Sequence, residues 1–128
     1  MPSQRRKILN VARNESFLKS RSAALEAAGY EVVAALNILS VERECETHGS
    51  FDLVIIGSSL PKGEKRRAML AVRQFCGRVP ILELYPPGTT PVGEEADEQL
   101  PSPDEPEALL AKVNEVLAKK RKKGRAAS

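Results

Sequence analysis

Few side chains in the sequence are of types that perform covalent chemistry, and none has the neighbours that such chemistry needs. Ser58 and Ser59 follow an apolar segment, but no histidine or other base adjoins them to activate a hydroxyl nucleophile. His48 is the only histidine, and we expect it in a solvated loop. Cys45 and Cys76 show neither a CxxC motif nor metal-ligand spacing, so we expect two reduced structural thiols. These residues predict neither an enzyme nor a metal site.

The segments that must position these residues alternate between apolar and amphipathic, which is typical of a parallel sheet covered by helices. We expect strands at 7–11, 30–35, 51–56, 79–84 and around 99–100, and helices at 14–28, 40–46, 64–75 and 104–118. Residues 86–93, PPGTTPVG, hold three prolines and two glycines, so the helix between the last two strands is expected to be shortened or missing. The predicted class is α/β, a three-layer αβα sandwich.

The composition is that of an ordinary globular protein. Of the 128 residues, 41% are hydrophobic and 29% charged, and there is no tryptophan. No apolar segment is long enough to cross a bilayer, and the basic residues 4–7 run into a strand-length segment rather than a signal-peptide core. We therefore predict a cytoplasmic protein with no membrane span.

The basic excess of the chain belongs to its C-terminus. Six of the 20 basic residues lie at 119–128, which leaves 14 basic against 17 acidic residues in the rest of the sequence. We divide the chain into one domain at 1–118 and a basic tail at 119–128 that is too charged to pack and is expected to be disordered. Residues Lys119–Arg125 keep one alternative function open, a salt-sensitive contact with nucleic acid or another anionic surface.

Five segments resemble, in order and spacing, the receiver domain of bacterial response regulators. They are KILNV, LEAAGYEVVAA, FDLVII followed by SSLP, VPILEL and PEALLAKVNEVL, and together they span 7–118. The resemblance implies a flavodoxin-like fold with a five-stranded parallel sheet of order 2-1-3-4-5. It also implies a role in two-component signal transduction.

The chain differs from the receiver family at every position of the family's reaction centre. The acidic pair after the first strand falls at Ala12 and Arg13, and the phosphorylated aspartate falls at Gly57. The hydroxyl residue after the fourth strand falls at Tyr85, and the lysine that precedes a proline falls at Ser102. Glycine supplies no nucleophile and Ala12 no metal ligand. We therefore expect no aspartyl phosphorylation, no bound Mg²⁺ and no other cofactor.

These departures predict a stand-alone signalling module that binds another protein, a kinase or a regulator, without a phosphoryl switch. The expected partner surface carries the acidic residues Glu83, Glu94, Glu95, Asp97 and Glu98. Two alternatives stay open at the positions of the family's reaction centre. One is an anion contact by Arg13, Ser58 and Ser59, and the other is a phosphorelay that uses an acceptor other than aspartate.

Three polar residues stand in or beside predicted core elements. Asn10 lies in the first strand and is expected to bond a neighbouring loop or Arg13, because an unpaired buried amide is costly. Glu83 lies in the fourth strand, and we expect its face of the sheet to be partly uncovered. Lys65 is expected on the outward face of its helix.

Overall fold

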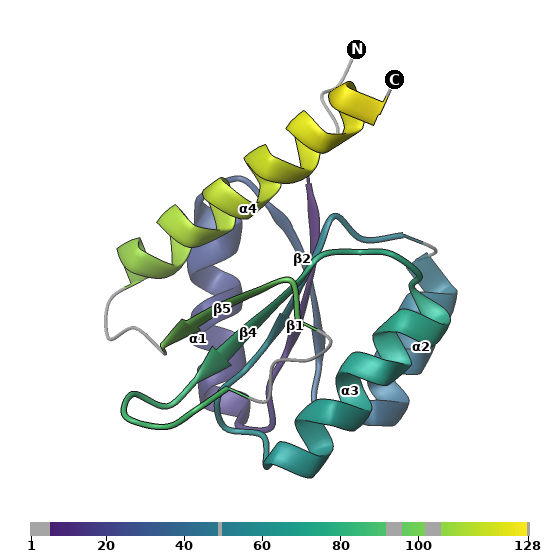
Figure 1. The fold of residues 1–128 in the computed structure, drawn as a ribbon. Coiled ribbons are helices and arrows are strands. Elements are labelled where there is room, and N and C mark those ends of the chain that lie inside the picture. The colour runs from purple at the N-terminus through teal and green to yellow at the C-terminus, as the bar shows by residue number, and fades with distance from the viewer. Residues whose placement is uncertain (1–5, 49, 92–95, 102–105, 128) are drawn as a thin grey trace.

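Five parallel strands form the centre of the protein (Figure 1). The structure is a computed structural model that describes residues 6–48, 50–91, 96–101 and 106–127. The strands are β1 (Lys7–Val11), β2 (Glu31–Ala35), β3 (Leu53–Ile56), β4 (Ile81–Tyr85) and β5 (Glu98–Pro101). Their order is β2-β1-β3-β4-β5, and every adjacent pair is parallel. The predicted fold class and strand order are confirmed.

Helices cover both faces of the sheet. α1 (Glu15–Ala27) and α4 (Pro106–Ala127) lie on one face, and α2 (Ile38–His48) and α3 (Lys62–Phe75) lie on the other (Figure 1). Alternate residues of β3 enter the two cores, Leu53 and Ile55 on the α1 and α4 side and Val54 and Ile56 on the other. A strand buried on both faces must be apolar throughout, which explains the LVII run.

Local signals set most helix ends, with small differences from prediction. The Asn14 side chain accepts a hydrogen bond from the Phe17 N–H (3.0 Å) and begins α1 as expected. Gly29 follows the helix with a φ of 99°. α2 begins before Ser40, because Asn37 Oδ1 accepts the Ser40 N–H (2.8 Å) and takes the capping role instead. The predicted start of α4 at Asp104 lies outside the described residues.

The connection between β4 and β5 forms no helix in its described residues, 86–91 and 96–97, as the prolines predicted. Thr89 donates its N–H to Pro86 O (3.1 Å), and Gly88 has a φ of 83°, so the chain turns here. β5 is longer than the predicted strand and pairs with residues Leu82–Tyr85 of β4.

The cysteines contradict the prediction of two reduced thiols. Cys45 of α2 and Cys76, which caps the C-terminus of α3, form a disulfide with a Cα–Cα distance of 5.2 Å. They are 31 residues apart and share no motif. Only the packing of α2 beside α3 brings them within bonding reach, and that arrangement is a property of the fold rather than of a local spacing.

α4 extends to Ala127, and the disorder expected from the charge of residues 119–128 stays a prediction. Alanine, lysine and arginine all have high helix propensity, which favours continuation of the backbone. At the start of this segment Lys119 Nζ lies 3.0 Å from Glu98 and 3.3 Å from Glu115. Neither α4 nor any other described helix combines the length and apolarity of a membrane span.

Candidate functional site

The candidate site lies at the carboxyl edge of the sheet, where β1, β3 and β4 end. Ala12 follows β1 and donates its N–H to Ala35 O (3.1 Å), and Gly57 follows β3 and donates to Val11 O (2.8 Å). Both residues are buried, and Tyr85 at the end of β4 is half-buried. The structure thus brings Ala12 and Gly57 together, whereas Ser102 lies outside the described residues.

Gly57 is closely surrounded on the side where a side chain would project. A Cβ atom built there would lie 3.0 Å from Val11 O, 3.1 Å from Arg21 Nη1 and 3.3 Å from Ala12 Cβ. The Val11 carbonyl is backbone in the β1 ladder and cannot move alone. The position that the resemblance assigns to a phosphorylated aspartate is therefore crowded, and an arginine side chain is one of the groups that fill it.

Arg21 of α1 is the site residue that sequence reasoning missed. Its Nη1 donates to Asn10 Oδ1 (3.0 Å), while Asn10 Nδ2 donates to Ser22 Oγ (3.0 Å) and to Leu18 O (3.3 Å). Burial lowers the pKa of Arg21, because desolvation disfavours the charged form, yet a guanidinium stays protonated at neutral pH. The available signal was spacing, because Arg21 lies three residues after Leu18 and four before Leu25, on the inward face of α1.

Arg13 lies elsewhere, and the side-chain partners of Asn10 all lie in α1, so the prediction that Asn10 bonds a neighbouring loop or Arg13 is wrong. Its Nη1 donates to Glu64 Oε2 of α3 (2.7 Å), and its side chain is 61% exposed. Ser58 is half-buried and Ser59 exposed in the turn after Gly57. The anion contact of Arg13, Ser58 and Ser59 stays a prediction, while the cation that contacts the Gly57 position is Arg21.

Glu83 is not on the surface, which corrects its place in the predicted partner face. Its side chain is fully buried, and Lys65 of α3 is 3% exposed and also points inward, contrary to prediction. Lys65 Nζ donates to Glu83 Oε2 (3.1 Å) and to Leu84 O (2.7 Å). The charge of Glu83 is tolerated because a buried cation pairs with it, and not because its face of the sheet is uncovered.

The acidic segment before β5 is described in part, since Glu94 and Glu95 lie outside the described residues. Asp97 Oδ2 accepts hydrogen bonds from Arg73 Nη2 (2.9 Å) and from the Ile81 N–H (2.8 Å). This carboxylate therefore ties the start of β5 to both α3 and β4.

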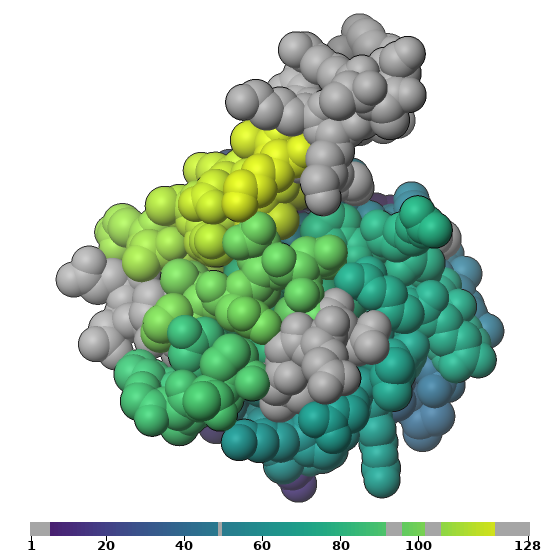
Figure 2. All heavy atoms as spheres, in the orientation of Figure 1, coloured from purple at the N-terminus to yellow at the C-terminus, as the bar shows by residue number. Residues whose placement is uncertain are grey.

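Glu98 makes the corresponding connection to α4. It lies 3.0 Å from both Lys112 Nζ and Lys119 Nζ. Hydrogen bonds from Lys119 and then Lys112 lower the pKa of Glu98. The space-filling view shows the green surface of β5 beside yellow α4 (Figure 2). The described acidic side chains of this face act as internal links, and their role as a partner surface stays a prediction.

Metal ligands do not gather in the described ranges of the chain, where no group of three or more histidine, cysteine, aspartate or glutamate side chains could hold an ion. His48, predicted in a loop, is the last residue of α2. Its Nε2 lies 3.2 Å from Glu44 Oε1, and its ring centroid lies 5.7 Å from that of Phe51. These contacts are those of a packing residue at a helix end.

Comparison with solved structures gives closely similar folds. The chemotaxis protein CheY4 of Vibrio cholerae is 28% identical, with a TM-score of 0.75 over 88% of this chain and 99% of that chain. A putative response regulator of Chloroflexus aurantiacus J-10-fl is 25% identical, with a TM-score of 0.77 over 90% and 99%. A CheY-like receiver domain protein of Methanospirillum hungatei JF-1 is 23% identical, with a TM-score of 0.78 over 94% and 99%.

The chain has the receiver-domain fold. No family model matches the sequence, and no curated protein matches it significantly. Ala12, Arg13 and Gly57 follow the carboxyl ends of β1 and β3 in this fold, and their assignment to the family's reaction centre stays a prediction.

Proposed function

We propose that this protein is a receiver-like signalling module that works without aspartyl phosphorylation and acts by binding another signalling protein. The observation that carries the proposal is the contact of the Arg21 guanidinium with the Gly57 position, at 3.1 Å from a Cβ built there. The fold supports a place in response-regulator signalling.

The first support is the absence of an attacking atom at the crowded position. Phosphoryl transfer to a protein requires an oxygen nucleophile, and Gly57 has no side chain. Replacement of Gly57 by a larger residue would press against Val11 O and Ala12 Cβ as well as Arg21. The surroundings are therefore adapted to glycine.

The second support is charge. Mg²⁺ in phosphoryl-transfer sites is held by carboxylates, phosphate oxygens and water. Here the position beside Gly57 holds the Arg21 cation, whose side-chain partner is the neutral amide of Asn10. Two unit charges about 4 Å apart repel by about 4 kcal/mol at an effective dielectric constant of 20, and a dication doubles that cost. The electrostatics of this edge oppose a metal-dependent reaction.

The third support is the network that holds the edge in one arrangement. Asn10 joins β1 to α1 through Arg21, Ser22 and Leu18 O, and Lys65 joins α3 to β4 through Glu83 and Leu84 O. Such buried polar networks order the elements that they connect. We infer a module with a fixed conformation and no catalytic activity of its own, whose output requires a partner such as a kinase or a regulator.

The test is affinity capture from the source cell, performed with and without acetyl phosphate and Mg²⁺. We expect the same signalling protein in equal amounts under both conditions, because the module has no phosphorylated state. The Arg66→Glu variant changes an exposed charge of α3 that lies away from the edge. Comparing its capture with that of the wild type tests whether this face of α3 contacts the partner protein. Capture that depends on acetyl phosphate, or a capture that contains no signalling protein, would contradict the proposal.

A further inference from the structure

The two outer strands of the sheet differ in how they are protected. β5 carries Pro101, and its Glu98 is held by two lysines of α4. β2 reads EVVAA, without proline, lysine or arginine. Edge strands usually carry such residues because an open row of backbone groups pairs readily with another strand. β2 is thus the less protected edge of the sheet.

The backbone of β2 presents hydrogen-bonding groups toward this open edge. Glu31 donates its N–H to Arg6 O (2.9 Å), and Ala35 O accepts the Ala12 N–H (3.1 Å), so both residues direct their backbone toward β1. Successive residues of a strand direct these groups to opposite sides. Val32 and Ala34 therefore direct their N–H and C=O groups away from β1.

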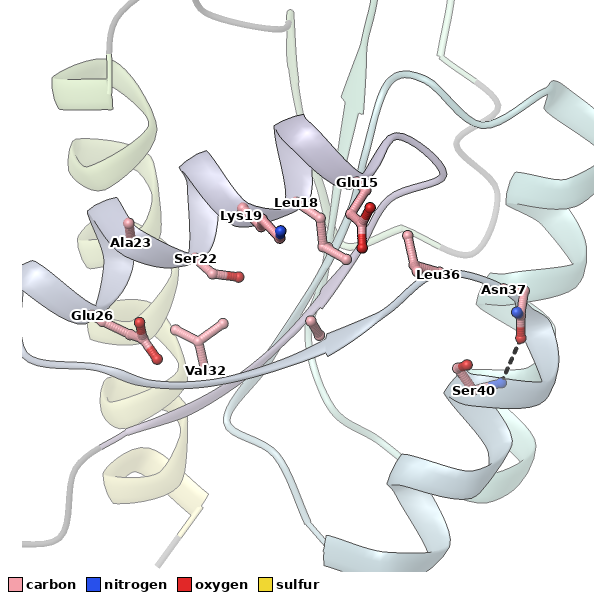
Figure 3. A pocket seen from close by; sticks show the side chains of 11 residues that line it. Glu15, Leu18, Lys19, Ser22, Ala23, Glu26, Val32, Leu36, Asn37 and Ser40 are labelled. Atoms are coloured by element: carbon pink, nitrogen blue, oxygen red, sulfur yellow. Dashed lines mark hydrogen bonds between the residues drawn. The ribbon is translucent and has the colours of Figure 1, made fainter.

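A groove of about 550 Å³ lies beside these two residues, between α1 and β2 (Figure 3). Val32 and Ala34 form its β2 side, and Leu18, Lys19, Ser22 and Glu26 are among the residues of its α1 side. In Figure 3 Glu26 of α1 lies beside Val32, and Ser22 points from α1 into the space between α1 and β2. A strand added to β2 would place every second side chain in this groove.

We propose that the β2 edge binds β2 of a second copy of this chain, antiparallel and centred on Val33. In that register Val32 stands opposite Ala34 of the second copy, and Ala34 opposite its Val32. All four residues direct their backbone groups outward, so each opposed pair exchanges two hydrogen bonds. The edge is self-complementary, as a closed two-fold dimer requires.

The charges of α1 fit the same two-fold axis. α1 returns antiparallel to β2, so the axis that relates the strands also sets the two α1 helices antiparallel. Lys19 and Glu26 are exposed and lie symmetrically about Ser22 and Ala23. Neither forms an ion pair with another residue in the described part of the chain. In the dimer Lys19 of each copy faces Glu26 of the other copy, so the two-fold axis gives two equivalent pairs.

The experiment is sedimentation equilibrium of the full chain over a dilution series, with hydrogen exchange at the Val32 and Ala34 amides. We expect a reversible dimer and slower exchange of these two amides as concentration rises. Ala34→Pro removes an outward N–H that β1 does not use, so it should give a folded monomer. Circular dichroism checks the fold of each variant.

A charge swap tests the register without a change in the backbone. Lys19→Glu should weaken the dimer by about tenfold or more, because two glutamates then face each other at both ends of the interface. Adding Glu26→Lys should restore it. Arg66→Glu on α3 is the matched control and should leave the dimer unchanged.

Three results would overturn the proposal. The first is a chain that stays monomeric at every concentration. The second is a dimer whose affinity is unchanged by Ala34→Pro and Lys19→Glu. The third is protection of the Val32 and Ala34 amides by a different protein while the pure chain is monomeric. The proposed signalling function does not rest on this dimer, and its own test is separate.

Discussion

Lys65 is a buried cation and Arg21 a half-buried one, and the two are held by different partners. Lys65 pairs with the Glu83 carboxylate and the Leu84 carbonyl, whereas Arg21 donates to the neutral oxygen of Asn10. Removing one member of a buried ion pair leaves the other charge without compensation, and this costs more than removing both. The two sites should therefore respond differently to substitution.

Lys65→Ala should lower the free energy of unfolding by about 3–5 kcal/mol, because Glu83 stays fully buried without its cation. The double variant Lys65→Met with Glu83→Leu should be closer to the wild type than either single change, since no buried charge remains. Urea unfolding measures all of these variants. A cost below about 1 kcal/mol for Lys65→Ala would mean that water reaches Glu83.

Gly57→Ala should cost about 1–3 kcal/mol through overpacking, because the new methyl group stands 3.0 Å from Val11 O and 3.1 Å from Arg21 Nη1. Adding Arg21→Ala should recover only part of this loss, since the backbone contact remains. Thermal unfolding of the single and double variants makes the comparison. Gly63→Ala is the control for the helix side of the turn, because a Cβ there meets no atom within 4 Å. A Gly57→Ala variant with the same thermal stability as the wild type would contradict the crowding around Gly57.

At the scale of elements, the sequence determined strands and helices well and their side-chain partners poorly. The LVII run, the Asn14 cap and the proline-rich connection each act through neighbouring residues, so all three were predictable. The disulfide and the Lys65–Glu83 pair join residues far apart in the chain. Their partners depend on how helices lie on the sheet, which composition and spacing do not specify.

The candidate site was likewise predictable where neighbouring residues determine it, and was missed where a distant residue contributes. Ala12 and Gly57 were placed together correctly because both end neighbouring strands of a known order. Arg21 was missed because it reaches the edge from the second turn of α1, where a charged residue is ordinarily taken as solvent-facing. Arg21 and Lys65 are charged residues at positions of their helices that face the sheet. Noting this spacing in the sequence would have predicted that both side chains point inward.

The Cys45–Cys76 disulfide should stabilise the packing of α2 against α3. A cross-link across 31 residues is expected to contribute about 2–4 kcal/mol, mainly by restricting the unfolded chain. Unfolding with and without a reductant should show this difference in the wild type and none in the Cys45→Ala, Cys76→Ala double variant. Two titratable thiols in the native protein, purified without reductant, would contradict the structure.

The link between β5 and α4 should depend on pH. Lys119 and Lys112 lower the pKa of Glu98, so the folded chain binds this proton more weakly than the unfolded one. The stability gained is present above the ordinary glutamate pKa of 4.5 and is lost as the pH falls through the lower folded value. Lys119→Ala should raise the pKa of Glu98 in an NMR titration, and Lys62→Ala should leave it unchanged. No rise in Lys119→Ala would exclude this link.

At the scale of the whole molecule, a receiver-domain fold has the Arg21 cation beside Gly57 at its carboxyl edge. The sheet order, the two core layers and the helix faces match those of receiver structures, with TM-scores of 0.75 to 0.78. Arg21 contacts the Gly57 position at the carboxyl edge, and our proposal is that this edge takes no part in phosphoryl transfer. We therefore propose that the receiver-domain fold is kept here without its phosphorylation chemistry.

Incubation of the purified chain with acetyl phosphate and Mg²⁺, followed by intact-mass measurement, tests this claim most directly. A receiver domain that carries the family's aspartate serves as the positive control in the same buffer. We predict that the control gains one phosphoryl group and that this chain keeps its mass. A gain of one phosphoryl group on this chain would contradict the account, wherever on the protein the group is attached.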